Sequence, residues 1–394
     1  MTRRILPFLL VGALCLAFSG PPAPACPFCT MSGQTLTDDV NQASMVLYGT
    51  LQNAKIDPSG DFGSGTTDLV IHSVVKKHDI LGDKKIITLP RYVPSDNKDS
   101  KTKFLIFCDV FKGKVDPYKG VPVKSDDIVK YLAGAIDLKG KDVPTRLKFF
   151  FNWLDNADIE ISNDAYKEFG NSDYKDFRAI TKDLPADRIV KWLDDPNTPA
   201  FRYGLYGSML GHCGDKKHAP VLKKMLDDPQ KRVTSGVDGI LAAYTLLEPK
   251  EGWDNLKGIL GDPKKEFMLR YAALRSIRFF MEQRPDVIEK KQLVDAACQL
   301  LDQSDIADLV IEDLRKWKQA DQTERVLGLF DKPSHNIPIV KRAVVRYALG
   351  MPENAKASSF VAALRTKDAD YVKDIEEILK LENTPTTPVP APKK

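Results

Sequence analysis

The amino-acid sequence predicts a two-part fold: a small antiparallel β-barrel or sandwich, followed by an α-solenoid of stacked helix pairs. The first observation is a change of hydrophobic period, because apolar residues alternate up to about residue 123 and recur at helical spacing afterwards. The second is a helix-end motif that returns about every 33 residues, as solenoid repeats do. The expected segments are a signal peptide over 1–25, a β-domain over 26–123, the solenoid over 124–381 and a disordered Pro/Thr-rich tail over 382–394.

The start of the chain has the pattern of a signal peptide. Arg3 and Arg4 precede an apolar run over 5–18, and small residues lead up to Ala25. Cleavage after Ala25 makes Cys26 the first residue of the mature chain, so we expect a periplasmic or secreted protein. A lipid anchor on Cys26 is the alternative, but the preceding residues depart from the bacterial lipoprotein pattern. No later segment is apolar for long enough to be an integral membrane helix.

Strand-like segments fill the first part of the mature chain. They are rich in β-branched and aromatic residues, and clusters of Gly, Pro, Asp and Ser separate them. In the segment 103–111 both alternating sets of side chains contain large apolar residues, so we expect this strand to be covered on both faces. The clearest strands are 44–52, 67–75, 84–89 and 103–111, which suffice for a small antiparallel barrel or sandwich.

Helical segments follow from about Ser125 onward. Apolar residues recur in each at i, i+3, i+4 and i+7, and the links between segments are short. Short links place successive helices side by side and antiparallel. The clearest segments are 126–138, 145–156, 185–195, 202–211, 218–228, 237–248 and 268–281.

A repeated motif marks the ends of some of these helices. Leu193 and Leu226 are each followed by Asp-Asp-Pro, and Leu260 is followed by Gly-Asp-Pro. Leu301-Asp302 and Phe330-Asp331 continue the series less regularly. Proline cannot continue a helix, and aspartate can accept hydrogen bonds from the open N–H groups of the next turn. A single helix pair cannot bury its apolar faces, so the repeat predicts a stacked solenoid.

These helix pairs with their Leu-(Asp/Gly)-Asp-Pro junctions resemble HEAT repeats over about 125–382. Armadillo-like pairs would have a similar pattern. The arrangement is also similar to exported bacterial HEAT-repeat proteins that share the start Cys-Pro-Phe-Cys, a resemblance that implies no activity. What it implies is an elongated protein with a concave surface that binds through its inner helices.

The N-terminal part is similar to netrin-like modules, the OB-type barrels of the metalloproteinase-inhibitor family. The resemblance rests on the cysteine-rich start and on "ASMVLYGTL" at 44–52, although the family begins Cys-x-Cys and this chain has Cys26-x-x-Cys29. It implies an OB-type barrel into which the N-terminal cysteine is disulfide-bonded. It also implies a free amine on Cys26 that could chelate the zinc of a protease.

Cys26 and Cys29 allow three interpretations. A thiol–disulfide oxidoreductase would use them as a redox pair, although no βαβ setting surrounds them. A zinc site would need two further ligands, and none stands nearby. A structural disulfide from either residue to Cys108, on an expected central strand, would tie the N-terminus to the β-domain, and we favour this last interpretation.

His212, Cys213 and His218 form a second cluster of ligand-type residues. They lie in the link "GHCGDKKHAP" between two helical segments, without an evident fourth ligand. A helix-end loop with a buried cysteine explains the same residues, so we do not predict a metal site.

Gly204, Gly207 and Gly211 share one face of an expected helix. Glycine weakens a helix by about 1 kcal/mol relative to alanine, so a compensating contact is expected. Close approach of a neighbouring helix is the favoured explanation, and a ligand crossing the same groove is the alternative.

Composition and charge complete the functional prediction. The chain has 43% hydrophobic and 28% charged residues and a formal net charge of +4, which gives no basic footprint for nucleic acid. We therefore predict a non-enzymatic binding or scaffold protein, without a cofactor, whose partner is another protein or peptide. Arg202, Arg270 and Arg278 are the candidate exposed contacts. The alternatives are a thiol–disulfide oxidoreductase that uses Cys26 and Cys29, and a metalloprotease inhibitor that uses the Cys26 amine.

Overall fold

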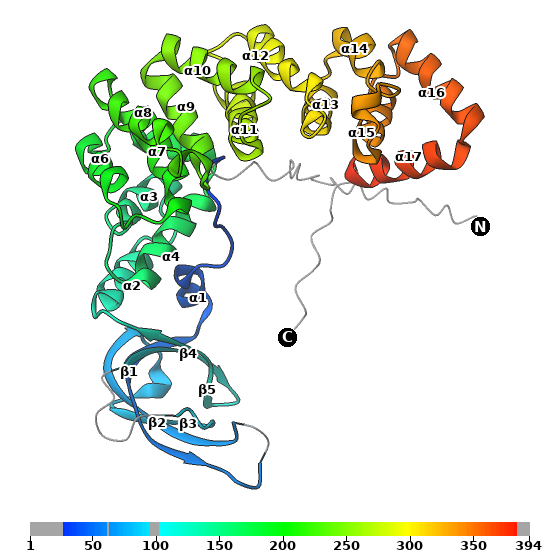
Figure 1. Ribbon diagram of the computed structural model, residues 1–394. Coiled ribbons are helices and arrows are strands. Elements are labelled where there is room, and N and C mark those ends of the chain that lie inside the picture. The colour runs from blue at the N-terminus through cyan, green and yellow to red at the C-terminus, as the bar shows by residue number, and fades with distance from the viewer. Residues whose placement is uncertain (1–26, 61–62, 95–101, 384–394) are drawn as a thin grey trace, which may run out of the picture.

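The computed structural model describes residues 27–60, 63–94 and 102–383 (Figure 1). Within them a five-stranded sheet is followed by a long series of helices, which agrees with the predicted β-then-α order. The molecule has the shape of an L, with the sheet at the end of one arm and the last two helices at the end of the other (Figure 1). The expected signal peptide, 1–25, lies outside the described residues, and so does the expected tail apart from its first two residues, which belong to the last helix.

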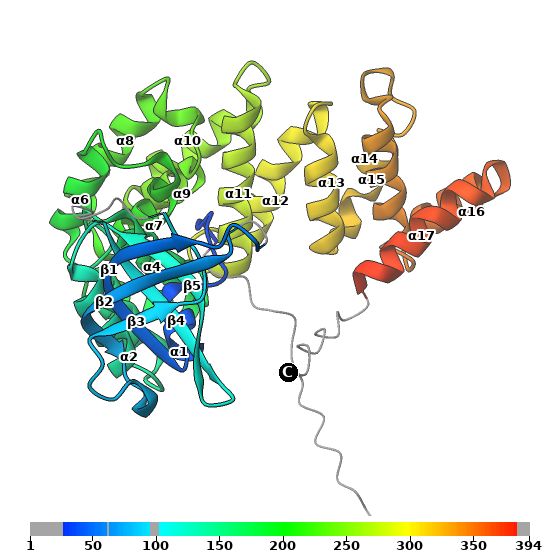
Figure 2. The same ribbon diagram turned by 90° about the horizontal axis from the view of Figure 1, so that it is seen from below.

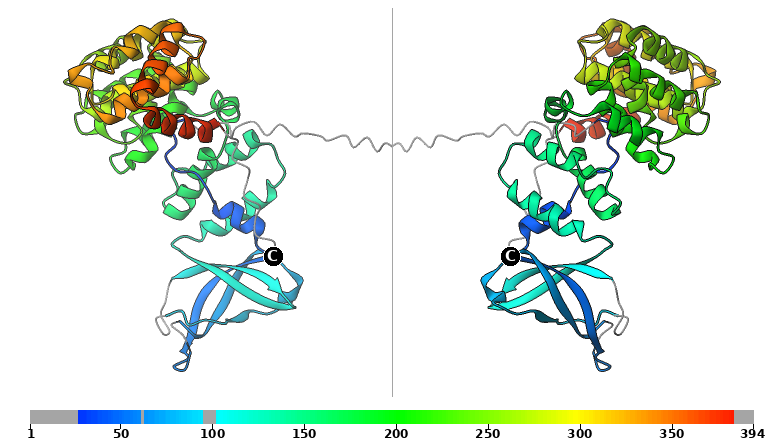
Figure 3. Two further views of the ribbon diagram at one scale, coloured as in Figure 1. Left: turned by 90° about the vertical axis from the view of Figure 1, so that its right-hand side faces the viewer. Right: turned by 90° about the vertical axis from the view of Figure 1, so that its left-hand side faces the viewer.

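The sheet is antiparallel throughout, with the strand order β3-β2-β1-β4-β5. One short helix, α1, precedes it and lies between the sheet and the following helices (Figure 3). Four strands fall where the sequence predicts them, and the fifth carries a Pro- and Gly-containing stretch that hides its period. The elements are α1 (Leu36–Gln42), β1 (Met45–Ile56), β2 (Gly65–Lys76), β3 (Ile86–Leu89), β4 (Lys103–Phe111) and β5 (Lys114–Val123).

The sheet is curled but not closed, so the predicted barrel is wrong. β3 and β5 are the two edges, and no ladder of hydrogen bonds joins them in the described part of the chain. The physical reason lies in these edges. β3 has only four residues, and β5 contains Pro117 and Pro122, which have no N–H to donate to a further strand.

Both faces of the sheet are covered, as predicted for the segment 103–111. Leu105 and Phe107 of β4 face α1 and α2 and belong to a core that continues through the helices. Ile106 and Cys108 point to the concave face, where β1, β2 and β3 enclose a smaller apolar core. The sheet is thereby attached to the helical part through one of its faces.

Sixteen helices follow the sheet in the described chain. Their lengths and short links are those of a stacked all-α unit. The first four after the sheet are α2 (Asp127–Asp137), α3 (Val143–Phe151), α4 (Ile159–Gly170) and α5 (Tyr174–Thr181), of which α2 and α4 lie in the arm that carries the sheet (Figure 1). The others are α6 (Ala186–Asp194), α7 (Tyr203–Cys213), α8 (Ala219–Asp227), α9 (Val237–Leu247), α10 (Pro249–Gly261), α11 (Phe267–Gln283), α12 (Lys290–Ala297), α13 (Ala307–Lys316), α14 (Thr323–Leu327), α15 (Pro338–Leu349), α16 (Ala355–Lys367) and α17 (Ala369–Asn383).

The second arm has two rows of helices. α7, α9, α11, α13 and α15 follow one another in a row on the inside of the L, and we call their exposed side the inner face (Figures 1 and 2). α7 contacts α9, α9 contacts α11, and α13 contacts α15. The even-numbered helices from α8 to α14 form the outer row (Figure 1).

The repeated sequence motif marks equivalent positions in this arrangement. Leu193, Leu226 and Leu260 stand in the last turns of α6, α8 and α10, respectively. The prediction that these three leucines mark helix ends is thus confirmed.

Candidate functional site: the inner face of the helices

An extended N-terminal segment lies on the inside of the L. Residues 27–37, which we call the strap and which include the first two residues of α1, run from α1 along α4 and α7 to α11 (Figure 1). Phe28 is only 1% exposed, and its ring lies 4.8 Å from that of Phe279 on α11. A segment that the sequence predicted as part of the β-domain therefore packs on the helices.

The helices hold the strap mainly through its backbone. Arg275 of α11 donates from Nη2 to the carbonyl of Pro27 at 3.2 Å. The side chain of Asn171 accepts from the N–H of Gly33 at 2.7 Å and donates to its carbonyl at 2.9 Å. Such contacts recognise an extended chain without depending on its side chains.

Two acidic residues of α4 bind the far end of the strap. Asp164 accepts hydrogen bonds from the N–H of Leu36 and the hydroxyl of Thr37, and Glu168 accepts from the hydroxyl of Thr35 at 2.9 Å. Burial raises the pKa of Glu168 to about 7 and also raises the pKa of Asp164. These carboxyl groups are buried because the strap covers them.

Two glycines make room for the strap. A Cβ at Gly170 would lie 2.0 Å from the carbonyl oxygen of Met31, and a Cβ at Gly204 would lie 2.4 Å from that of Phe28. No side chain fits at such distances, so the backbone of the strap requires glycine at both positions.

The helical signal for this groove is a stripe of polar residues along α4 and its C-cap, in which Asp164 and Glu168 are buried and Asn171 is exposed. Asp164, Lys167, Glu168 and Asn171 are spaced at i, i+3, i+4 and i+7, and each of them bonds to the strap. Sequence reasoning missed these residues because such a stripe normally faces solvent.

The glycines of α7 also admit a neighbouring helix, as predicted. A Cβ at Gly207 would lie 2.7 Å from the side chain of Ile240, and a Cβ at Gly211 would lie 2.7 Å from the Cα of Ala243, both on α9. Gly204 allows close approach of both the strap and α9, because a Cβ at Gly204 would also lie close to Gly236, the residue before α9.

The predicted disulfide to Cys108 is not formed. Cys29 is disulfide-bonded, whereas Cys108 is a free, fully buried cysteine. The reason is position: Cys108 faces the concave core of the sheet, while Cys29 lies in the strap on the helices. Cys26 lies outside the described residues.

The cluster of His212, Cys213 and His218 consists of separate residues in local structural contacts. Nε2 of His212 bonds to the hydroxyl of Tyr174 at 2.6 Å, and burial lowers the pKa of His212 to about 4. Nδ1 of His218 accepts from the N–H of Asp215, and burial raises the pKa of Cys213 to about 11. No group of three or more His, Cys, Asp or Glu side chains in the described chain is placed to hold a metal ion.

Arg202 and Arg270 are not exposed, contrary to the prediction. Arg202 is 6% exposed and bonds to the carbonyl of Leu154 and the hydroxyl of Ser162. Arg270 is 4% exposed and forms a two-pronged ion pair with Asp305. Arg202 bonds to α4 and to the turn after α3, and Arg270 bonds to the segment before α13, so both side chains are engaged inside the protein.

Arg278 lines a groove of about 490 Å³ on the inner face, between α11, α13 and α15, which we call the open groove. Its Nε donates to both oxygens of Asp313, at 2.9 and 2.8 Å. Burial raises the pKa of Asp313 to about 6, although Arg278 opposes this shift. Glu312 pairs in turn with Arg346, so most charges of this groove are internally compensated.

Arg342 and Ile339 of α15 also line the open groove. Arg342 is exposed and forms no ion pair within the part of the chain that the structure describes. Ile339, one turn earlier on α15, is 58% exposed. Arg342 and Ile339 thus present a cation and an aliphatic side chain on α15, while the acidic Glu282 and Asp308 line the same groove on α11 and α13.

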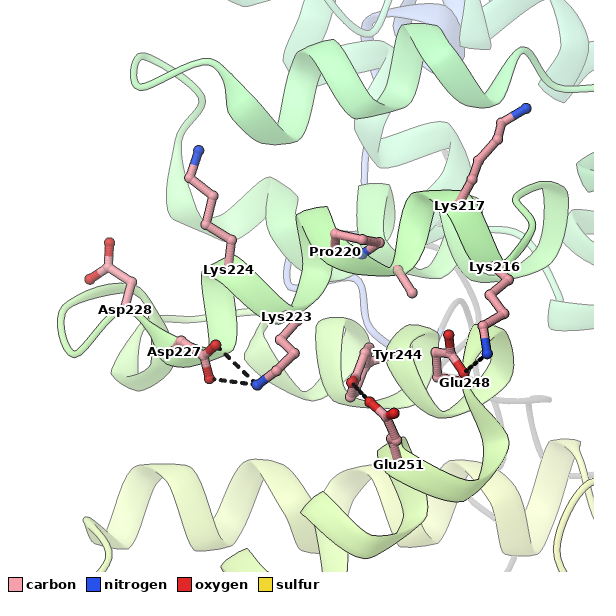
Figure 4. Close-up of a pocket in the computed structure, with 11 residues that line it drawn as sticks. Lys216, Lys217, Pro220, Lys223, Lys224, Asp227, Asp228, Tyr244, Glu248 and Glu251 are labelled. Carbon is pink, nitrogen blue, oxygen red and sulfur yellow. Dashed lines mark hydrogen bonds and ion pairs between the residues drawn. The ribbon is translucent and has the colours of Figure 1, made fainter.

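A larger groove of about 920 Å³ lies on the outer row, between α8 and α9 (Figure 4). Each of its four lysines forms an ion pair with an acidic side chain. Lys216 pairs with Glu248 and Lys223 with Asp227 inside the groove. The other two pairs, Lys217–Asp215 and Lys224–Asp194, reach acidic residues at its border. Because its charges are paired, this groove offers no site for an anion, and it does not enter the functional argument.

No family model, curated protein or solved structure matches this sequence. Among the described residues, no helix is long and apolar enough to cross a membrane.

Proposed function

We propose that this protein is an exported, non-enzymatic binding or scaffold protein, built as a HEAT-like solenoid whose inner face binds an extended segment of another protein. The observation that carries this proposal is the strap. The inner side of the helices already holds an extended segment through backbone contacts from Asn171 and Arg275. Stacked helices repeat similar surfaces along a row, so the same mode of binding can extend further along it.

The open groove is the proposed binding surface. It starts at α11, the helix on which the strap ends, and continues along the same row to α13 and α15. Arg342 supplies a positive charge at α15, whereas Glu282 lines the groove on α11. A partner segment with an acidic and an aliphatic residue against α15 would complement Arg342 and Ile339.

A charge reversal tests the proposal. The full mature chain would be immobilised and used to capture proteins from the exported fraction, with Arg342→Glu and Ile339→Asp compared with the wild type. We expect one or more captured proteins to be lost, at least about tenfold, from both variants. Lys250→Glu, on the exposed start of the outer helix α10, is the matched control.

Two outcomes would contradict it. Capture that persists with Arg342→Glu and Ile339→Asp would mean that the open groove is not the binding surface. Capture that is equally reduced by Lys250→Glu would mean that net charge, and not the groove, governs binding.

A thiol–disulfide function is the second candidate, because Cys29 is the described cysteine that is disulfide-bonded. Against it, the residues after Cys29 are extended, and the first helix begins only at Leu36, so no helix N-terminus stabilises a thiolate. Reduction of an insulin disulfide by the wild type but not by Cys29→Ser would support this candidate. The inhibitor hypothesis depends on Cys26, outside the described residues.

A further inference from the structure

The strap is anchored at two separate places. Phe28 is buried against α11, and Thr35 and Leu36 are buried against α4. Between these anchors, residues 29–34 are exposed or half-buried and are held by hydrogen bonds. A segment with two anchors and a weakly buried middle can dissociate without unfolding the helices beneath it.

We propose that the groove across α4, α7 and α11 is a peptide-binding site that the chain's own strap masks, and that it accepts an extended segment of the same chemistry from a partner. This inference rests on the proposed binding function and names a second site and its regulation. The strap is the self-inhibiting occupant. A partner gains access when the strap leaves.

The contacts define the chemistry of the partner segment. A large aromatic side chain is needed where Phe28 fills the space between Phe279 and Gly204. A glycine is needed five residues later, because Gly33 has a positive φ of 102° and both its backbone groups bind Asn171. A hydroxyl residue two positions further on takes the place of Thr35 at Glu168.

The strap has an advantage over any free peptide because it is tethered. Linkage gives it an effective concentration in the millimolar range, so a partner competes poorly until an anchor of the strap is weakened. Phe28→Ala removes the anchor on α11 and leaves every residue of the groove intact. The anchor on α4 stays in place, so the substitution should release the strap from α7 and α11 and open that end of the groove.

The probe is a fluorescent synthetic peptide with the sequence of residues 27–37 and serine at the position of Cys29. We expect the full-length Phe28→Ala protein to bind this peptide at least about tenfold more tightly than the wild type, measured by fluorescence anisotropy. Hydrogen exchange should show the strap of Phe28→Ala exchanging at least about tenfold faster than that of the wild type.

A second substitution blocks the groove. Gly170→Ala places a Cβ where the backbone of the bound segment lies, so the double variant Phe28→Ala/Gly170→Ala should not bind the peptide. Gly258→Ala is the matched control, because a Cβ at Gly258 of α10 meets no atom within 4 Å. Phe28→Ala/Gly258→Ala should bind as Phe28→Ala does.

Three results would overturn the inference. The first is that Phe28→Ala does not bind the peptide although hydrogen exchange shows its strap released. The second is that the double variant with Gly170→Ala binds the peptide as well as Phe28→Ala does, and the third is that the strap of Phe28→Ala stays as protected as that of the wild type. Each is independent of the open groove. Failure of the Arg342→Glu experiment would leave these measurements unaffected, so the two proposals can fail separately.

Discussion

At the scale of single residues, the arginines show what a sequence conceals. In the sequence Arg202 and Arg270 have the pattern of ordinary solvated cations, but each is buried and bonded to groups far away in the chain. The partners of Arg202 include Leu154 and Ser162, about forty residues or more away in the chain. No local sequence pattern indicates such a long-range contact, so the exposure of an isolated arginine could not be predicted.

Arg202→Met should therefore destabilise the protein strongly. The substitution removes hydrogen bonds to Leu154, Ser162 and Asn163, and the carbonyl of Leu154 then keeps only the hydroxyl of Tyr206. We expect the free energy of unfolding to fall by about 2–4 kcal/mol, measured by urea denaturation. Arg91→Met, at an exposed arginine of the sheet domain, should change it by less than about 0.5 kcal/mol. Equal effects of the two substitutions would contradict the structural role.

Glu168 should make the protein less stable as the pH rises. Burial raises its pKa from 4.5 to about 7, so the folded state favours the neutral carboxyl and binds more protons than the unfolded state between these values. The groups around it are Arg146 of α3, Thr35 of the strap, Asp164 of α4 and Asp38 of α1. Its contribution is fully present below about pH 4.5 and is lost as the pH rises through about 7.

Urea denaturation at pH 5 and pH 8 measures this effect. The fall in the free energy of unfolding between the two values should be smaller for Glu168→Gln than for the wild type. Glu160→Gln, on an exposed turn of the same helix, should keep the dependence of the wild type. A Glu168→Gln variant with the full wild-type dependence would show that this carboxyl does not titrate as described.

At the scale of elements, the aspartate before proline in the repeated motif makes the same hydrogen bond after each of three helices. Oδ1 of Asp195 accepts from the N–H of Asn197 at 2.8 Å, and Asp228 and Asp262 bind the N–H groups two residues later at 2.8 and 2.9 Å. Aspartate therefore shapes the same turn after α6, α8 and α10. This order is local, which is why the sequence could predict it.

Gly211→Ala should destabilise the pairing of α7 with α9. Alanine favours an isolated helix, but its Cβ would lie 2.7 Å from the Cα of Ala243, so the two helices must separate. We expect the free energy of unfolding to fall by about 1–3 kcal/mol. Gly258→Ala, where a Cβ has free space, should raise it by up to about 1 kcal/mol. A stabilising Gly211→Ala would mean that α7 and α9 are not closely packed.

At the scale of the whole molecule, the strap packs on the helices, although it precedes the sheet in the chain. The strap and α1 precede β1 in the chain, but their contacts reach α4 and α11, more than a hundred residues away. The sheet is thus inserted between two segments that pack together. The free Cys108 and the bonded Cys29 follow from this arrangement, because the two cysteines lie in different parts of the molecule.

The free thiols should react only when the protein unfolds. Burial raises the pKa of Cys108 to about 12 and those of Cys213 and Cys298 to about 11, so almost no thiolate is present at pH 8. A maleimide should label all three on addition of denaturant and none quickly in the folded protein. Non-reducing peptide mapping should find no peptide bonded to Cys108, and a Cys29–Cys108 peptide would refute the arrangement.

The sequence by itself determined the order of the elements, four of the five strands, the two-sided burial of β4 and the equivalent helix ends at Leu193, Leu226 and Leu260. Each of these depends on a hydrophobic period or a turn residue within a short stretch. Only the tertiary structure decided that the sheet stays open, that Cys108 is free, that Arg202 and Arg270 are buried and that the strap fills a groove on α4 and α11. These features depend on contacts between residues far apart in the chain, and no local pattern specifies which distant groups will meet.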